Sequence, residues 1–157
     1  MNNYDRMIKL ADDVFASRKD PNQLNVDEAV MDRLHKLHPS TLNEYDNGEG
    51  PVAWILVFPT TANLMNRFVN KAISEKELFD LTPVNAQHEA LYLCSALVLE
   101  EYRGQGIAKT LTLKAIENIR NDFPIKALFV WAFSKAGEEL AENVALQTSL
   151  PLLKRAD

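Results

Sequence analysis

The chain has 157 residues, a formal net charge of −5 at pH 7 and 46% hydrophobic residues. This length predicts one domain, residues 1–157, that buries roughly 70% of its unfolded surface without disulfides or a structural metal. The single cysteine, Cys94, excludes a disulfide framework and a multi-thiolate zinc site. The acidic balance argues against nucleic acid as a partner. The sequence has no apolar run of about 18 residues and no signal pattern, so we expect a cytoplasmic protein that does not bind membranes.

The first forty residues have a helical pattern. Apolar residues recur at helical spacing over Met7–Phe15, and a break is predicted at Lys19-Asp20-Pro21-Asn22. Asn25 or Asp27 is expected to cap a second helix, which Pro39 ends.

The middle of the chain predicts a hairpin, two helices and a buried strand. Thr41–Tyr45 and Val52–Phe58 flank a glycine-containing turn and are typical of hairpin strands. Helical spacing returns over Leu64–Ala72 and, more briefly, over Glu75–Phe79. Ala90–Leu99 is apolar on both faces, as a central strand must be.

The last third predicts a strand–helix–strand unit. Ile107–Ile119 is an amphipathic helix, Ala127–Phe133 is a second buried strand, and Lys135–Leu146 is a last helix. The two strands should be parallel and joined by a right-handed crossover, which makes the fold class α/β (α+β).

The loop between the central strand and its helix, Glu100–Gly106, carries the strongest chemical signal. Two of the five glycines, Gly104 and Gly106, stand here and would let a phosphate approach the backbone closely. The first N–H groups of the helix lack internal partners, and the helix dipole is positive there. Arg103 adds a guanidinium fork suited to phosphate oxygens. The loop therefore predicts a phosphate-bearing ligand.

Two familiar phosphate loops do not fit these residues. In a Walker A loop, Arg103 would stand at the first glycine, and Ala108 would replace the glycine before Lys109-Thr110. In a dinucleotide fingerprint, the third glycine would be Lys109.

The pattern that fits is Arg-x-x-Gly-x-Ala over Arg103–Ala108. With Val98 and Tyr102, it resembles the acyl-CoA pyrophosphate loop of GNAT-family N-acetyltransferases. The resemblance is good over Tyr92–Phe133, weaker to Leu146 and poor before residue 40. It implies a mixed, mostly antiparallel sheet whose parallel central strand pair is splayed for CoA, with residues 90–146 as the CoA-binding core.

The resemblance also implies a set of cofactor-binding residues. Strand backbone would bind the pantetheine arm, while Arg103 and the amides that follow it would bind the pyrophosphate. The implied set is Leu97, Val98, Leu99, Arg103, Gly104, Gln105, Gly106, Ile107, Ala108, Lys109 and Ser134.

The chain departs from the family where Asn, Ala and Tyr are common and Ser134, Gly137 and Ala141 stand instead. The family's tyrosine usually protonates the leaving thiolate. Tyr92 or Tyr45 could replace it; otherwise water or an unidentified group must protonate the thiolate. Help from a general acid is typically worth about 10²–10⁴-fold, so a slower enzyme is expected.

The implied reaction is acetyl transfer from acetyl-CoA, without a metal, to a small-molecule or protein amine that attacks the thioester directly. A backbone N–H near Leu97 would stabilise the oxyanion. Glu89 is the candidate base, although it lies one residue from the matching position and would face the other way unless a bulge intervenes. The alternative is a non-catalytic acyl-CoA-binding or regulatory module, which Ala141 and the helical N-terminal region favour.

Structural roles are expected for the remaining distinctive residues. These are helix capping for His35 and His38, an exposed strand start for His88, a small apolar role for Cys94, and core or acyl-pocket wall for Trp54 and Trp131. Glu138, Glu139 and Glu142 are expected on a solvated helix face.

The C-terminal tail offers few residues for further strands. Leu150–Lys154 provides one strand at most, which predicts a shortened C-terminal edge. Such an edge is either left open or completed by a partner chain, for example in a homodimer.

Overall fold

The structure, a computed structural model, describes residues 1–18 and 23–156. The predicted break at Lys19-Asp20-Pro21-Asn22 lies outside them. The elements in chain order are α1 (Asn3–Arg18), α2 (Glu28–Leu37), β1 (Leu42–Asp46), β2 (Pro51–Thr60), α3 (Ala62–Val69), α4 (Glu75–Leu81), β3 (Ala90–Val98), a 3₁₀ turn η1 (Glu100–Tyr102), α5 (Ile107–Arg120), β4 (Ala127–Val130), α6 (Lys135–Thr148) and β5 (Leu152–Lys154).

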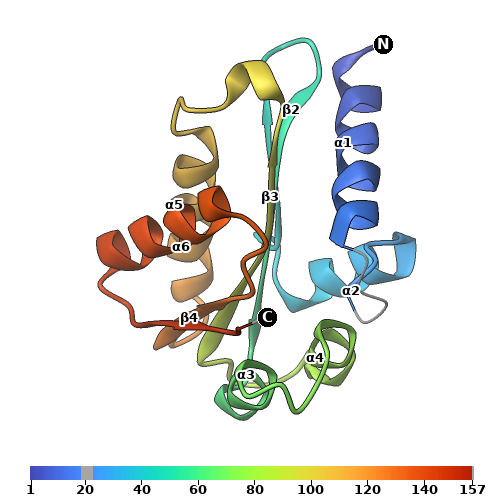
Figure 1. The fold of residues 1–157 in the computed structure, drawn as a ribbon. Helices are drawn as coiled ribbons and strands as arrows, with labels where there is room; N and C mark the ends of the chain where they lie inside the picture. The colour runs from blue at the N-terminus through green and yellow to red at the C-terminus, as the bar shows by residue number, and fades with distance from the viewer. Residues whose placement is uncertain (19–22, 157) are drawn as a thin grey trace.

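One sheet, in the order β1-β2-β3-β4-β5, separates two layers of helices (Figure 1). Helices α1 and α2 lie on one side of it, and α5 and α6 lie on the other. The pairs β1–β2 and β2–β3 are antiparallel, whereas β3–β4 and β4–β5 are parallel. The predicted mixed sheet with a parallel central pair is confirmed. The sheet has two antiparallel and two parallel strand pairs, so it is not mostly antiparallel. The second parallel pair arises because the crossover through α6 returns β5 parallel to β4.

Local signals explain where most elements begin and end. Asp27 caps α2, since its carboxylate accepts a hydrogen bond of 2.9 Å from the N–H of Val30. Ser74 and Glu77 form a reciprocal capping box at the start of α4. Strand β4 is shorter than the predicted Ala127–Phe133 and ends at Val130.

The C-terminal tail forms one short strand, as predicted. The residues Leu152–Lys154 of β5 pair with Leu128–Val130 of β4. Within residues 1–18 and 23–156, no strand pairs with the outer edge of β5. None of the described helices is long and apolar enough to cross a membrane.

The fully buried side chain of Tyr92 fixes the first half of β3. Its ring centroid lies 5.3 Å from that of Phe58, 5.1 Å from that of Phe68 and 4.9 Å from that of Phe129. Aromatic pairs at such distances add about 0.5–1.5 kcal/mol each beyond area burial. A second core, centred on Ile116 and Leu128, packs under α5 and α6. The strand is thus held from both faces.

The prediction that His88 is exposed is wrong. Its side chain is 0% exposed, because the ring of Phe123 covers it at a centroid distance of 4.8 Å. Neither ring nitrogen has a hydrogen-bond partner among the described residues. Burial lowers the pKa of His88, since the charged form would lose its hydration.

We therefore expect the free energy of unfolding to depend on pH through His88. The unfolded chain binds the proton more tightly, with a pKa of about 6.5. The free energy of unfolding is therefore unaffected by His88 above that pH. Below it, the free energy of unfolding falls by at most about 1.4 kcal/mol per pH unit. His88→Leu should lose less stability than the wild type between pH 7.5 and 5.5 in urea titrations. Equal losses in the two proteins would contradict this origin.

Candidate functional site

Strands β3 and β4 separate midway along the sheet. They pair from Ala90 and Ala127 to Leu93 and Val130, where β4 ends, while β3 continues along β2 to Val98. Beyond Leu93, this edge of β3 pairs with no strand of the described chain. Apart from the carbonyl of Val98, which accepts from Arg103, its backbone groups are therefore available to a ligand.

A β-bulge lies where the two strands separate. Val57 of β2 faces Leu93 and Leu56 faces Ser95, so Cys94 is the extra residue. A bulge bends the strand and shifts its alternation by one position. Tyr92 therefore shares a face with Leu97, because their partners Phe58 and Trp54 share a face of β2.

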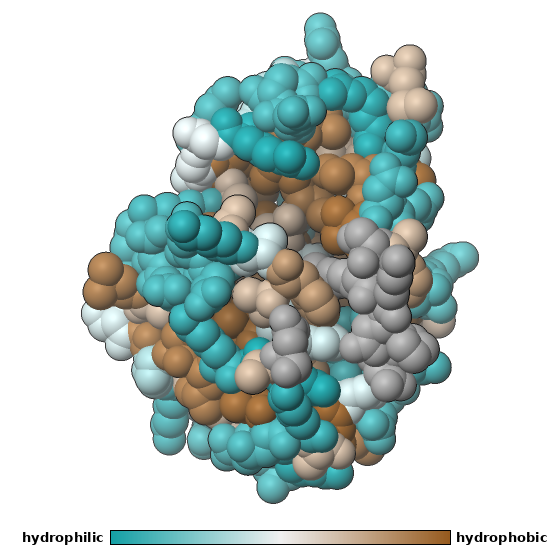
Figure 2. Space-filling model, in the orientation of Figure 1, coloured by the Kyte–Doolittle hydropathy of each residue, from teal (hydrophilic) through white to brown (hydrophobic). Residues whose placement is uncertain are grey.

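A cleft of about 750 Å³ occupies the split. It is lined by α1 from one side of the sheet, by α5 and α6 from the other, and by β3 between them. Figure 2 shows a hollow with a largely hydrophobic floor, framed by polar residues, where β3 runs between α1 and α6 in Figure 1. The cleft thus passes through the sheet.

The glycine loop forms one end of this cleft. Gly104 and Gly106 have φ of 78° and 77°, a left-handed backbone that disfavours residues with a Cβ. An added Cβ would meet no other residue within 4 Å at either position, so the space above the loop is open. Gly106 precedes α5 and provides no side-chain cap. The first N–H groups of α5 and its dipole thus form an anion site at the cleft.

Two cations line the cleft near this helix start. The Nε of Arg103 donates a 3.0 Å hydrogen bond to the carbonyl of Val98, which fixes the guanidinium at the end of β3. Lys109 lines the cleft from the first turn of α5. The loop therefore combines backbone donors, a dipole and two positive charges.

Contacts with α1 and the hairpin hold the start of the loop. Arg6 forms a 2.7 Å ion pair with Glu101, and this hydrogen bond lowers the pKa of Glu101 below its ordinary value. Asn47 donates a 2.6 Å hydrogen bond to the hydroxyl of Tyr102, which also lines the cleft. The two contacts tie η1 to distant parts of the chain.

Most of the residues proposed from the sequence lie together in the cleft. Its lining includes Leu97, Val98, Arg103, Gly104, Gly106, Ile107, Ala108, Lys109 and Ser134. Leu99 is instead buried with Met7 and Val52, and the exposed Gln105 donates to the carbonyl of Glu101. The role of each residue toward acyl-CoA stays a prediction.

The structure does not bring Glu89 to this cleft. Glu89 precedes β3 at the end remote from the loop, 3.7 Å from the Nζ of Lys126. A strand rise of about 3.3 Å per residue puts roughly 25 Å between Glu89 and Leu97. The bulge at Cys94 comes after Glu89, so it cannot turn this side chain to the other face.

Tyrosines predicted to replace the missing acid also lie outside the lining. Tyr92 is fully buried and Tyr45 is 45% exposed on the hairpin. Ala141 lines the cleft from α6, so this wall has a methyl group where the resemblance implies a tyrosine.

Sequence reasoning missed a buried carboxylate behind the cleft. Glu75 is 1% exposed and accepts hydrogen bonds from the N–H of Leu24 at 2.6 Å and from the hydroxyl of Tyr92 at 2.5 Å. Its Oε2 lies 3.9 Å from the sulfur of Cys94, which lines the cleft. Hydrogen-bond donors thus face both oxygens of the carboxyl group. Glu75 starts a helix in the sequence, and its long-range partners leave no local signal.

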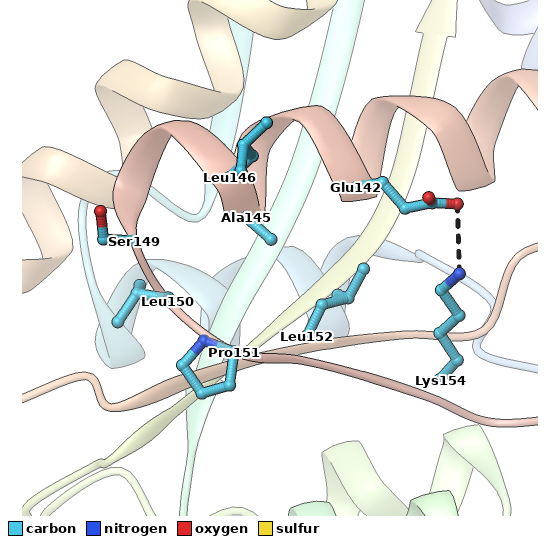
Figure 3. A pocket seen from close by; sticks show the side chains of 8 residues that line it. All are labelled: Glu142, Ala145, Leu146, Ser149, Leu150, Pro151, Leu152 and Lys154. Atoms are coloured by element: carbon cyan, nitrogen blue, oxygen red, sulfur yellow. Dashed lines mark hydrogen bonds and ion pairs between the residues drawn. The ribbon is translucent and has the colours of Figure 1, made fainter.

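A second hollow, shown in Figure 3, is shallower and lies between α6 and β5. Its polar feature is an ion pair of 3.1 Å between Lys154 and Glu142, and Glu138 pairs with the same lysine. Glu139 of the same acidic run lines the cleft instead. No group of three or more His, Cys, Asp or Glu suited to a metal occurs among the described residues.

Comparisons with known proteins give one family. The model of the acetyltransferase (GNAT) family matches residues 7–141, which extends far ahead of the resemblance seen in the sequence. The ribosomal-protein-alanine N-acetyltransferase from Brucella melitensis biovar Abortus 2308 is similar to this chain, with a TM-score of 0.42 and 15% identity. The match covers 64% of this chain and 57% of that chain. No curated protein matches the sequence.

We expect Glu75→Leu to lower the free energy of unfolding by about 3 kcal/mol, because it removes the acceptor of two buried hydrogen bonds and leaves both donors without a partner. Glu75→Gln should cost less, since an amide can still bond to Leu24 and Tyr92. Lys76→Leu, at the next and exposed position, should change stability by under about 0.5 kcal/mol. Urea denaturation measures all three, and equal effects of Glu75→Leu and Lys76→Leu would contradict the role of Glu75.

Proposed function

The chain belongs to the GNAT family of acetyltransferases, and on that basis we propose that it transfers an acetyl group from acetyl-CoA to an amine. The observation that carries the proposal is the split between β3 and β4, which ends at the uncapped start of α5. The fold provides an unpaired strand edge and an anion site in one cleft.

The residues at the loop fit an acyl-CoA. The open space above Gly104 and Gly106 would admit a pyrophosphate, and the first N–H groups of α5 would donate to it. Arg103 and Lys109 would balance its charge. The unpaired edge of β3 beyond Leu93, up to the N–H of Val98, would bond to the pantetheine amides. These residues, within residues 90–146, form the proposed CoA-binding core of the single domain.

The bound donor would supply an activated thioester, and the chain would orient it. A backbone N–H at the unpaired edge of β3 would donate to the developing oxyanion. The amine nitrogen would form the new bond to the acyl carbon and lose a proton to solvent as the bond to sulfur breaks. Ala141 has no hydroxyl, so water or another group of the cleft would protonate the departing sulfur. The missing acid predicts a modest rate.

The setting of this reaction is the cytoplasm in our proposal. The buried thiol of Cys94, which is not in a disulfide, fits a reducing compartment. The acceptor is a small-molecule or protein amine, and nucleic acid and membrane are not expected partners. The outer edge of β5 would be the contact in a homodimer, because an uncovered strand edge favours pairing.

We expect Arg103→Ala combined with Gly104→Val to raise the Kd for CoA at least about 100-fold, a loss of roughly 2.7 kcal/mol. The double variant removes a cation and places a branched side chain at positive φ in the anion site. Lys114→Ala removes a cation from an exposed position of the same helix and should bind CoA normally. Isothermal titration calorimetry measures both, and unchanged affinity in the double variant would overturn the loop assignment.

Mass spectrometry with acetyl-CoA and a panel of amines distinguishes an acetyltransferase from a non-catalytic acyl-CoA-binding module. An enzyme gives an amine product that is about 42 Da heavier than the amine, because an acetyl group replaces one hydrogen. CoA binding without product from any amine would instead identify a non-catalytic acyl-CoA-binding module.

Glu89→Gln tests the base predicted from the sequence. Because Glu89 lies beside Lys126 outside the cleft, we expect its transfer rate to stay within about twofold of the wild type. A fall of about 10²-fold or more, the typical contribution of a general base, would restore Glu89 as the base. Steady-state kinetics at saturating acetyl-CoA measures the effect.

A further inference from the structure

Two carboxylates stand close to the anion site at the start of α5. Glu100 and Glu101 are the first two residues of η1, which leads directly into the glycine loop. Consecutive Cα atoms lie about 3.8 Å apart, so the Cα of Glu101 is at most about 11 Å from that of Gly104. The loop also folds back on η1, since Nε2 of Gln105 donates to the carbonyl of Glu101 at 3.4 Å.

The charge of Glu101 would oppose the binding of a pyrophosphate at this loop. An exposed charge acts over about 10 Å at 0.1 M salt, which is the distance that separates η1 from the loop. Like charges repel each other at this range. Arg103 and Lys109 attract an anion from the cleft, but the described ion pair of Glu101 is formed with neither of them.

A cation from α1, 95 residues earlier in the chain, neutralises Glu101. An Nη of Arg6 donates to Oε1 of Glu101 at 2.7 Å. This hydrogen bond raises the pKa of Arg6 and lowers that of Glu101, so both groups are charged at pH 7. Neither residue belongs to the described lining of the cleft, so Arg6 influences a ligand there through Glu101.

Packing holds Arg6 at this position. Its neighbour Met7 is fully buried in one cluster with Val52 and Leu99, and Leu99 directly precedes η1. Figure 1 shows that α1 begins at the end of the sheet where β3 passes into the yellow turn before α5. The ion pair therefore joins two elements that the core already holds together, and it is present before a donor binds.

We propose that Arg6 is a positioning residue for the donor, which neutralises Glu101 and thereby strengthens the binding of the pyrophosphate of acyl-CoA. The inference rests on the proposed function. The effect concerns donor binding and not the chemical step, because the pyrophosphate takes no part in bond making. The N-terminal helix α1 thus contributes to the donor site without touching the donor.

Three variants distinguish this electrostatic role from a structural one by isothermal titration calorimetry with CoA. Arg6→Ala should raise the Kd about five- to tenfold at about 50 mM salt, because it leaves the carboxylate unpaired. Glu101→Gln should leave the Kd unchanged or lower it. Arg6→Ala combined with Glu101→Gln should restore the Kd to within about twofold of the wild type. Weak binding by all three variants would mean that the pair only fixes η1, and would overturn the inference.

Salt and the charge of the ligand provide a second measurement. At 1 M salt the screening length falls to about 3 Å, so the difference in Kd between Arg6→Ala and the wild type should disappear. S-acetylpantetheine carries the thioester without the pyrophosphate. Arg6→Ala should therefore raise KM for acetyl-CoA but not KM for acetylpantetheine, with kcat unchanged. An equal rise of KM for the two donors would contradict the proposal.

Two further variants serve as controls, and all of them are expected to fold, since exposed ion pairs add little to stability. Lys9→Ala removes another cation of α1, which is 67% exposed and pairs with Asp13. Arg6→Lys keeps the charge beside Glu101. Both should bind CoA within about twofold of the wild type. Unchanged affinity in Arg6→Ala would overturn the inference and leave the proposed function intact, whereas a wild type that does not bind CoA would overturn both.

Discussion

Backbone pairing between β3 and β4 stops at Leu93 and Val130, and the cleft depends on that interruption. Buried backbone groups almost always find hydrogen-bond partners, so an edge released inside the fold is a place where a ligand can supply them. The same end of β3 leads into the glycine loop and α5, whose first N–H groups also lack partners. One interruption therefore brings two sets of unpaired donors and acceptors into a single cavity.

Rigid packing around the first half of β3 makes that interruption stable. Tyr92 is held by three aromatic neighbours and by Glu75, a buried carboxylate that also accepts from Leu24 ahead of α2. The strand is thus fixed where pairing ends, and Leu24, just ahead of α2, is attached to the same point. A reactive site needs such support, because small displacements of a donor or nucleophile cost rate.

Features set by neighbouring residues could be predicted from the sequence. The cap at Asp27, the glycine loop and the parallel pair β3–β4 depend on short-range patterns. The buried roles of Glu75 and His88 could not be predicted from the sequence, because their partners are far along the chain. The apolar run to Phe133 suggested a longer strand, whereas its last residues are apolar because they line a cleft. The position of Glu89 relative to the site depended on register, which no local pattern specifies.

The bulge at Cys94 also restricts how the length of the chain can change. Upstream of it, even-numbered side chains such as Tyr92 face the layer of α1 and α2, and downstream of it odd-numbered ones such as Leu97 do. A deletion of Cys94 would restore an uninterrupted ladder with β2 and leave the later side chains of β3 on their present faces, because they would keep their partners in β2. An insertion of one residue after the bulge would instead turn the side chains that follow it to the opposite layer. This half of β3 can therefore lose one residue without exchanging the two walls of the cleft, but it cannot gain one.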